Sequence, residues 1–380
     1  MAINQAMEQY AKDCYEDVKT FLRELCVIPA PSHHEEKRAA WVKDWMEKNG
    51  AKNPFIDDAL NVIWPVNDTG DNDLIVFMAH TDVVFPDTTP LPFHEADGKY
   101  FCPGVSDDTA PLSVLMHVAK YFVNGGFTPK TGILFVANSC EEGLGNLKGS
   151  RMIVDTYGSR IKELITVESK LNRVLSRAVG SHRYRVTVRT EGGHSYGAFG
   201  NRNAIRCLAS MIDTFYSIKV PVNGDSKTTY NVGAIEGGTS VNTIAQKASM
   251  LFEYRSDDKE CLGKMKAAFD AIIEAYRATG IEVEVELLGE RPCGGELDPV
   301  AYNALIDRVK ASIVSIVGEE PSFGSGSTDA NYPLSKGIPA TCIGACTSVG
   351  AHTREEWVDL ASLYTGTRFL LDFVSNYFEV

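Results

Sequence analysis

The spacing of hydrophobic residues along the chain indicates two kinds of architecture. Before about residue 180 and after about residue 290, short apolar runs alternate with segments in which apolar residues recur every three or four positions. The runs predict buried strands, and strands that alternate with helices are typical of an α/β fold with a mixed, mostly parallel sheet flanked by helices. The predicted strands are Leu74–Met78, Ile133–Ala137, Leu164–Val167 and Thr341–Gly344.

The first apolar segment with helical spacing lies at the N-terminus. The residues that would share one face of a helix there are Tyr10, Cys14, Val18, Phe21, Leu22 and Leu25. A second helix follows the proline-bounded loop that begins "IPAPSHH", and we expect Gly50 to end it. A third helix, "APLSVLMHVAKYFVNGG", lies between the first two predicted strands.

A period of two replaces this pattern between about residues 180 and 290. In "HRYRVTVRTEG" every second residue is apolar and most of the others are arginines, and "ASMLFEYRS" and "IEVEVELLG" alternate in the same way. Such alternation is typical of antiparallel strands with one buried face. An intervening helix would bury Ile205, Leu208, Ile212 and Phe215. We therefore predict an α+β domain at residues 180–290, inserted into a domain formed by residues 1–179 and 291–380.

Composition and charge narrow the classes of partner. The chain has 380 residues and a formal net charge of −13, and its basic residues form no long cluster, which argues against nucleic acid and anionic membranes as partners. No apolar run approaches the roughly 20 residues needed to span a membrane, and the N-terminus lacks the apolar core of a signal peptide. Nine cysteines without a C-x-x-C pair indicate reduced thiols and a cytoplasmic protein.

Ionisable residues recur where the predicted parallel strands end. Because ligands of open α/β sheets bind at the carboxyl ends of the strands, we expect these side chains to lie together. Carboxylates that lie together repel one another, and divalent cations would relieve the repulsion. Histidine nitrogen and carboxylate oxygen are zinc ligands, and a two-metal site needs a bridging carboxylate. The candidates are His80, Asp82, Asp107, Asp108, Glu141, Glu142, Glu168 and His352.

Glu141 and Glu142 are adjacent, so an extended backbone would point their side chains in opposite directions. The two carboxylates therefore cannot both bind the same metal ion. One of them can be a ligand while the other faces the water between the metals and acts as its base.

The chain resembles the di-zinc amidohydrolase and exopeptidase family of carboxypeptidase G, aminoacylase, acetylornithine deacetylase, succinyl-diaminopimelate desuccinylase and the bacterial tripeptidases. Six stretches carry the resemblance in the family's order and cover nearly the whole chain: "HTD", "GVSDD", "CEEG", "GGHS", "GGTSVNTIA" and "GAHTREEW". "GGHS" and "GGTSVNTIA" are most similar to the tripeptidase-like branch. The resemblance implies a zinc exopeptidase-like fold in which the inserted domain is a lid and dimerisation domain.

The resemblance also implies two divalent metal ions per chain, zinc with cobalt or manganese as alternatives. Asp107 would bridge the two ions, with Asp108 as the alternative bridge, and a cis peptide bond would join these two residues. The implied ligands are His80, Asp107 and Glu168 for one ion, and Asp107, Glu142 and His352 for the other. Many relatives have a lysine two residues after the bridging aspartate, whereas this chain has Thr109 and lacks that positive charge.

Further roles follow from the same resemblance. Asp82 would orient His80, which is a common way to fix the tautomer of a metal-bound histidine. Glu141 would be the general base that deprotonates the metal-bridging water and then the proton donor to the leaving amine. Ser327, Thr328 and Asp329 match a loop that lines the substrate site.

The inserted domain would supply three more residues. His194 would stabilise the oxyanion, generally in the active site of the partner subunit of a homodimer. Asn242 and Arg255 would contact the substrate, and Arg255 could pair with a substrate carboxylate. The alternative for Arg255 is an ordinary solvated strand residue.

These residues predict a metal-dependent hydrolase of an amide bond in small peptides, such as a dipeptidase, tripeptidase or aminopeptidase. A deacylase of N-acyl amino acids is the first alternative, because it would use the same metal centre. An inactive metal-binding relative is the second alternative. The intact Glu141 argues against it, because such a relative would lose the base.

Overall fold

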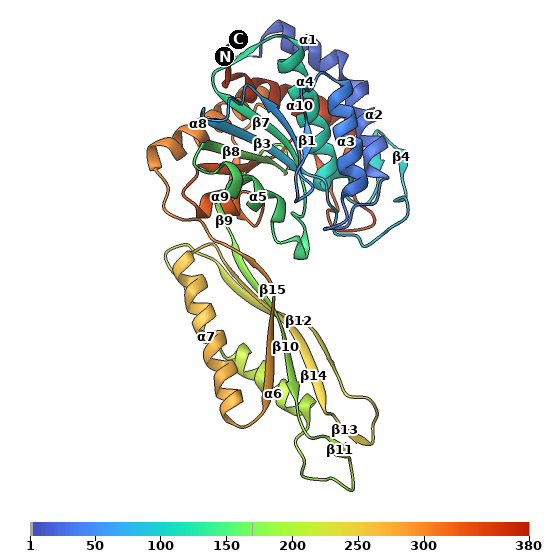
Figure 1. Ribbon diagram of the computed structural model, residues 1–380, viewed down its shortest axis with the longest axis vertical. Coiled ribbons are helices and arrows are strands. Elements are labelled where there is room, and N and C mark those ends of the chain that lie inside the picture. Colours follow the sequence, from blue (N-terminus) through green and yellow to red (C-terminus); the bar gives the residue numbers. More distant parts are fainter. Residues whose placement is uncertain (1–2, 169, 380) are drawn as a thin grey trace. The chain divides into compact units, whose positions relative to one another are not determined.

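The computed structural model describes residues 3–168 and 170–379, and the chain divides into two compact units (Figure 1). Unit 1 comprises the chain up to Ala178 together with the chain from Gly295 onwards, and unit 2 is Val179–Gly294. Unit 2 continues past residue 290, the predicted end of the inserted domain, because its last strand, β15 (Glu282–Arg291), extends beyond that point.

Unit 1 contains an eight-stranded sheet in the order β1-β2-β7-β3-β8-β17-β9-β16. Strands β7, β3, β8 and β17 are neighbours and run parallel, which confirms the predicted mostly parallel sheet. The pairs β1–β2, β2–β7 and β17–β9 are antiparallel. The bounds are β1 Phe55–Ile56, β2 Val62–Val66, β3 Leu74–His80, β7 Gly132–Asn138, β8 Ile161–Val167, β9 Arg173–Ala178, β16 Ser322–Gly326 and β17 Ala340–Ile343.

Helices cover both faces of this sheet, so its central strands are buried on two sides. In β3, Ile75, Phe77 and Ala79 belong to one hydrophobic core, while Leu74, Val76 and Met78 belong to another. This alternation explains why β3 is a continuous apolar run. The first core includes residues of α1 (Gln5–Asp13), α2 (Tyr15–Cys26), α3 (Glu36–Lys48), α4 (Ala110–Asn124), α8 (Pro299–Ile316) and α10 (Leu360–Ser375). The second includes residues of α5 (Lys148–Tyr157) and α9 (Asn331–Ser335).

The N-terminal segment forms two helices instead of the single predicted one. α1 ends at Asp13 and α2 begins at Tyr15, with Cys14 between them at φ −85° and ψ −2°. The Cys14 N–H still donates to the carbonyl of Tyr10 at 2.9 Å, so the helical spacing continues across the junction. Five of the six residues of the predicted apolar face are buried as a result, and Tyr10 is half-buried. Gly50 follows α3 with φ 97°, a conformation that favours glycine after a helix end.

Unit 2 is an antiparallel sheet, β12-β14-β10-β15, packed on two helices. The apolar face of β10, which carries Tyr184, Val186 and Val188, is buried as predicted. The prediction for Ile205 is wrong, because its side chain is 41% exposed. Helix α6 buries Ala204, Cys207, Leu208, Met211 and Phe215, a face that excludes Ile205. The bounds are β10 Gly180–Arg189, β11 Gly193–His194, α6 Ala204–Tyr216, β12 Thr228–Gly237, β13 Thr243–Ile244, β14 Lys247–Ser256 and α7 Lys259–Ala278.

Several short elements complete unit 1. A small sheet has the order β18-β19-β5-β4, and β20 pairs with β6. In the part of the chain that the structure describes, no helix is long and apolar enough to cross a membrane. The bounds are β4 His94–Ala96, β5 Lys99–Phe101, β6 Thr128–Pro129, β18 Ser348–Val349, β19 Trp357–Asp359, β20 Phe378–Glu379, and the single turns η1 Val105–Thr109 and η2 Gly143–Gly145.

Candidate metal centre

The predicted ligands follow the carboxyl ends of four neighbouring parallel strands in unit 1. His80 is the last residue of β3, Glu141 and Glu142 follow β7, Glu168 follows β8, and His352 lies after β17. Because these strands are adjacent in the order β7-β3-β8-β17, residues distant in sequence meet at one edge of the sheet.

Asp107 lies between two histidines at this edge. Its Oδ1 is 3.1 Å from His80 Nε2, and its Oδ2 is 3.0 Å from His352 Nε2. His352 Nε2 is also 3.2 Å from Glu142 Oε1. A carboxylate that presents one oxygen to each of two ligand groups has the arrangement required of a bridge between two metal ions.

Asp108, the alternative bridge, faces a different group. Its Oδ2 accepts a hydrogen bond from the backbone N–H of His80 at 2.8 Å, and its side chain is buried. The peptide bond between Asp107 and Asp108 is cis. Asp108 therefore positions the main chain of His80, while the carboxylate of Asp107 faces the imidazoles.

Two groups of side chains have ligand atoms close enough for a shared ion. The ligand atoms of His80, Asp107 and Glu142 all lie within 4.8 Å of one another, and so do those of His80, Glu141 and Glu168. The second group differs from the implied ligand set, because Glu141 takes the place of Asp107 beside His80 and Glu168. Glu141 and Glu142 fall into separate groups, as expected for adjacent residues that point apart.

The donor set fits divalent cations. Glu168 Oε2 is buried and accepts no hydrogen bond from any residue within the described ranges. Burial, and next the negative charge of Glu141, raises the pKa of Glu168 well above its ordinary value. Burial also raises the pKa of Glu142. A cation would satisfy the unpaired oxygen and stabilise both carboxylates, and nitrogen and oxygen donors of this kind suit zinc.

His352 occupies the position of a charge partner when no cation is bound. Hydrogen bonds to Asp107 and Glu142 raise the pKa of His352 to about 10. A protonated His352 and a metal ion would therefore compete for the same two carboxylates, because a histidine must be neutral to bind a metal.

Asp82 supports the site in two ways. His80 Nδ1 lies 3.1 Å from the main-chain oxygen of Asp82 and 3.4 Å from its Oδ1, in keeping with the predicted orienting role. The Asp82 carboxylate also accepts hydrogen bonds from the backbone N–H groups of Glu141 and Glu142, each at 2.9 Å. Ser32 Oγ donates a further bond at 2.6 Å. One buried carboxylate thus positions both glutamates as well as the histidine.

Glu356 is a further residue of this site that was not predicted from the sequence. Its buried carboxylate accepts hydrogen bonds from the N–H groups of Gly104 at 2.7 Å, Ser106 at 2.8 Å and Asp107 at 3.0 Å, and from Ser106 Oγ at 2.7 Å. These bonds hold the turn that carries Asp107. The only signal in the sequence is the position of Glu356 within "GAHTREEW", and nothing there distinguishes it from its exposed neighbour Glu355.

Comparison with known proteins agrees with this geometry. A model of the peptidase family M20/M25/M40 matches residues 76–376. The chain belongs to this family. The resemblance predicted from the motifs is thereby confirmed, and the chain is a metallohydrolase.

Individual relatives of this M20-family chain differ in the activity that their names give. The succinyl-diaminopimelate desuccinylase of Bordetella petrii is 25% identical over 76% of this chain and 79% of the relative. A tripeptidase from Staphylococcus aureus matches with a TM-score of 0.77 at 19% identity, over 96% of this chain and 98% of its own. A dinuclear metal-binding M20 peptidase from Bacillus subtilis matches with a TM-score of 0.64 at 15% identity, over 95% of this chain and 98% of its own. The two structures confirm the predicted fold class.

In unit 2 of this M20-family chain, the structure brings His194 and Asn242 together. β11, which contains His194, pairs with β13, and the Ser195 N–H donates to the carbonyl of Asn242 at 3.0 Å. His194 is exposed, and its Nδ1 accepts bonds from the N–H groups of Tyr196 and Gly197, each at 3.3 Å. In the neutral ring, an acceptor at Nδ1 requires the proton on Nε2.

Arg255 lies in β14 of the four-stranded sheet, not in the two-stranded sheet of β11 and β13. It is eight residues along β14 from Lys247, which corresponds to about 26 Å of extended strand. Arg255 Nε and Nη2 bind the two carboxylate oxygens of Glu253 at 3.0 and 2.9 Å. The guanidinium therefore has a partner within its own strand, and its contact with substrate remains a prediction.

Thr328 and Asp329, expected near the substrate, are buried within unit 1. Asn138 Nδ2 donates to Asp329 Oδ2 at 2.5 Å, and Ser150 Oγ donates to the Asp329 carbonyl at 2.8 Å. These bonds connect the loop at residues 327–329 to the end of β7 and to α5.

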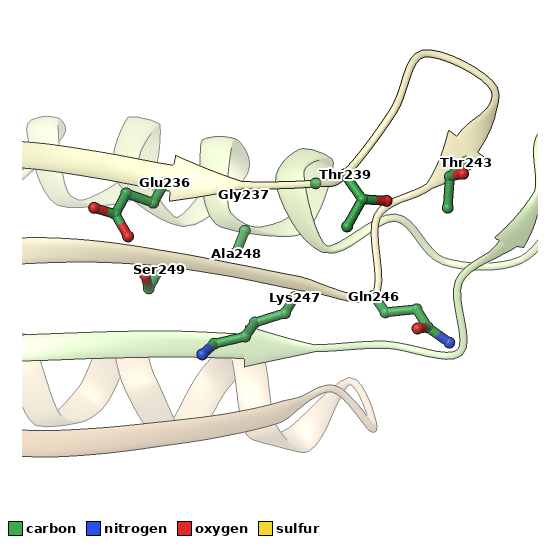
Figure 2. Close-up of a pocket in the computed structure, with 9 residues that line it drawn as sticks. Glu236, Gly237, Thr239, Thr243, Gln246, Lys247, Ala248 and Ser249 are labelled. Atoms are coloured by element: carbon green, nitrogen blue, oxygen red, sulfur yellow. The ribbon is translucent and has the colours of Figure 1, made fainter.

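Each unit has a pocket of its own. A groove of about 380 Å³ follows β12 and β14 in unit 2, and Glu236, Thr243 and Lys247 are among its lining residues (Figure 2). It contains none of the predicted metal ligands. A pocket of about 170 Å³ in unit 1 is lined by Asp107 and Glu168, so this smaller pocket is the one that adjoins the candidate metal centre.

Proposed function

We propose that this M20-family chain hydrolyses the amide bond of small peptides, as a dipeptidase, tripeptidase or aminopeptidase. The observation that carries the proposal is the position of Asp107, with one carboxylate oxygen at His80 and the other at His352. The tripeptidase of Staphylococcus aureus, which has the same fold, supports a peptide substrate.

The proposed chemistry assigns a task to each side chain. Two divalent ions bound at this edge would polarise the scissile carbonyl and lower the pKa of the attacking water. Glu141 accepts the proton of that water and passes it to the nitrogen of the leaving amine. The Nε2–H group of His194 donates a hydrogen bond to the oxyanion that develops on the carbonyl oxygen. Asn242 and Arg255 contact the rest of the substrate.

Zinc is the proposed metal, with cobalt or manganese as alternatives, because two histidines contribute nitrogen donors and the remaining donors are carboxylates. We also propose a cytoplasmic location. All nine cysteines are free and buried, which is compatible with a reducing compartment.

A homodimer through unit 2 is the proposed assembly, with His194 of one protomer acting at the metal centre of its partner. Three exposed apolar side chains near His194 support this arrangement: Tyr196 at 89%, Phe199 at 91% and Val241 at 103% exposure. Strand β12 lies at an edge of the sheet and offers unpaired backbone groups to a partner.

A deacylase of N-acyl amino acids is the second candidate. The identity to the succinyl-diaminopimelate desuccinylase of Bordetella petrii favours it, and the same metal centre would serve. The third candidate, an inactive metal-binding protein, is disfavoured because Glu141 is present beside His80 and Glu168.

One experiment separates the three candidates. The purified chain is loaded with zinc, cobalt or manganese, its metal content is measured, and it is given dipeptides and tripeptides alongside N-acetyl and N-succinyl amino acids. About two metals per chain with cleavage of free-amine peptides is the expected result. Cleavage of the acylated compounds alone would make the chain a deacylase. Metal binding without any turnover would support the inactive relative.

A further inference from the structure

The pocket of about 170 Å³ beside the candidate metal centre contains basic as well as acidic residues. Two proposed metal ligands, Asp107 and Glu168, share its wall with Lys170 and Arg173. The other lining residues are Ser106, Ser348 and Ala351. A molecule that enters this pocket would therefore lie against the metal centre and two cationic side chains at once.

Main-chain hydrogen bonds hold the backbone of Lys170 and Arg173 in place. Lys170 forms a parallel bridge with Cys346, and Arg173 is the first residue of β9. The Arg173 N–H donates to the carbonyl of Lys170 at 2.9 Å, which closes a turn between them. Both side chains thus project from one short turn that is anchored to the sheet.

Among the residues that the structure describes, Lys170 and Arg173 form no ion pair, and both are exposed. Lys162, an exposed lysine near the start of β8, differs because its Nζ lies 3.1 Å from Asp73 Oδ1. Unpaired cations that line a pocket favour an anionic ligand.

The negative charge of the candidate metal centre explains why Lys170 and Arg173 would be needed to bind an anion. Five carboxylates at the edge of the sheet would repel an anionic substrate, and the four positive charges of two divalent ions would not fully neutralise their five negative charges. Lys170 and Arg173 add positive charge on the side of the pocket, so that an anion is attracted to it. The five carboxylates are those of Asp107, Asp108, Glu141, Glu142 and Glu168.

We propose that Lys170 and Arg173 form a subsite that binds a substrate carboxylate close to the scissile amide. The assignment rests on the proposed amide hydrolysis at the metal centre and names its substrate class, a compound with a free carboxylate near the bond that is cut. Arg173 can hold both carboxylate oxygens and Lys170 supplies a second charge. The carboxylate can come from the C-terminus of a peptide or from an acyl group such as succinyl.

The test compares acids with their neutral amides. Alanyl-alanine is paired with alanyl-alaninamide, and N-succinyl-alanine with N-succinamyl-alanine. In the zinc-loaded K170M/R173M variant, kcat/KM for the preferred acid should fall about 10-fold or more, while the matching amide changes less than about threefold. The control variant K162M should retain the wild-type ratio of kcat/KM for the acid to kcat/KM for the amide. If kcat/KM falls only for alanyl-alanine, the carboxylate is the C-terminus of a peptide. If it falls only for N-succinyl-alanine, the carboxylate belongs to the acyl group.

A binding measurement keeps the subsite separate from the reaction. Calorimetric titration of zinc-loaded protein should show tighter binding of succinate than of succinamate, and K170M/R173M should abolish the difference. Absence of all amide hydrolysis in fully loaded wild-type protein would refute the proposed function but leave this binding test decisive. The subsite would be refuted if the double variant still preferred the acid to the amide as strongly as the wild type does. It would also be refuted if kcat/KM for the amide fell as much as kcat/KM for the acid.

Discussion

The metal-binding edge of unit 1 and the His194 region of unit 2 position their polar residues in different ways. In unit 1, a buried carboxylate holds the backbone of proposed site residues, as Asp82 does for Glu141 and Glu142. In unit 2, His194 is exposed and its hydrogen bonds come from main-chain groups two and three residues away. A fold can prearrange a metal centre within one chain, whereas an exposed histidine on a short two-stranded sheet needs a substrate or a partner to define its role.

The largest effect on turnover is expected when the proposed general base, Glu141, is replaced. Glu141→Gln should lower turnover about a thousandfold, because the amide cannot accept the proton of the attacking water. Metal content, measured by elemental analysis, should remain at the wild-type level. Glu142→Gln is the matched control, since it changes the adjacent residue and should lose metal. If Glu141→Gln also loses metal, Glu141 is a ligand, as its position beside His80 and Glu168 allows.

His194→Ala tests the proposed role of the exposed histidine of unit 2. Loss of one oxyanion donor should reduce kcat about a hundredfold without change in metal content, since no predicted ligand lies in unit 2. His94→Ala, which replaces another exposed histidine, serves as the control and should retain activity. An unaffected rate in His194→Ala would show that this histidine has no catalytic role.

A mixing experiment then tests whether His194 acts in the partner's site. Two inactive variants, Glu141→Gln and His194→Ala, are combined and allowed to exchange subunits. If His194 acts across the dimer, one site of each mixed dimer regains both residues, and about a quarter of wild-type activity should return. No recovery, together with light scattering that shows an active monomer, would contradict the action in trans.

Glu356→Gln should produce a smaller change, this time in metal affinity. The carboxylate of Glu356 accepts four hydrogen bonds from the turn that carries Asp107, and an amide cannot accept all of them. We expect affinity for zinc to fall about 10-fold to 100-fold, as is common when the partners of a metal ligand are altered. Glu355→Gln changes the exposed neighbour and should leave affinity unchanged. Equal affinities for the two variants would refute the positioning role.

The contrast between Glu356 and its ligand neighbours shows what the sequence could and could not predict. The parallel strands are continuous apolar runs that end in His80, Glu141 or Glu168, so both the sheet and its ligand edge could be predicted from pattern and motif. Glu356 could not, because a carboxylate buried by hydrogen bonds to a distant turn leaves no periodic signal. Ile205 was misplaced because it lies about 100° around the helix from Ala204, at the margin of the face that α6 buries.

The smallest predicted effect concerns stability, and it follows from a comparison of two buried histidines of unit 1. His80 lies among carboxylates, whereas His117 lies against Phe21 and Trp45, with ring centroids 5.8 and 5.0 Å away. Burial lowers the pKa of His117 from 6.5 to about 4. The unfolded chain therefore takes up a proton before the folded chain does, and the free energy of unfolding must fall as pH decreases from 6.5 towards 4.

His117→Phe should remove this dependence while it preserves aromatic packing and activity. Between about pH 7 and about pH 5.5, the wild type should lose roughly 1 kcal/mol more unfolding free energy than the variant, as measured by urea denaturation. His34→Gln, which replaces an exposed histidine, should behave as the wild type does. Identical pH dependence in His117→Phe and the wild type would mean that His117 takes up its proton at the same pH in the folded and the unfolded chain. Burial among aromatic rings would then be insufficient to keep His117 neutral.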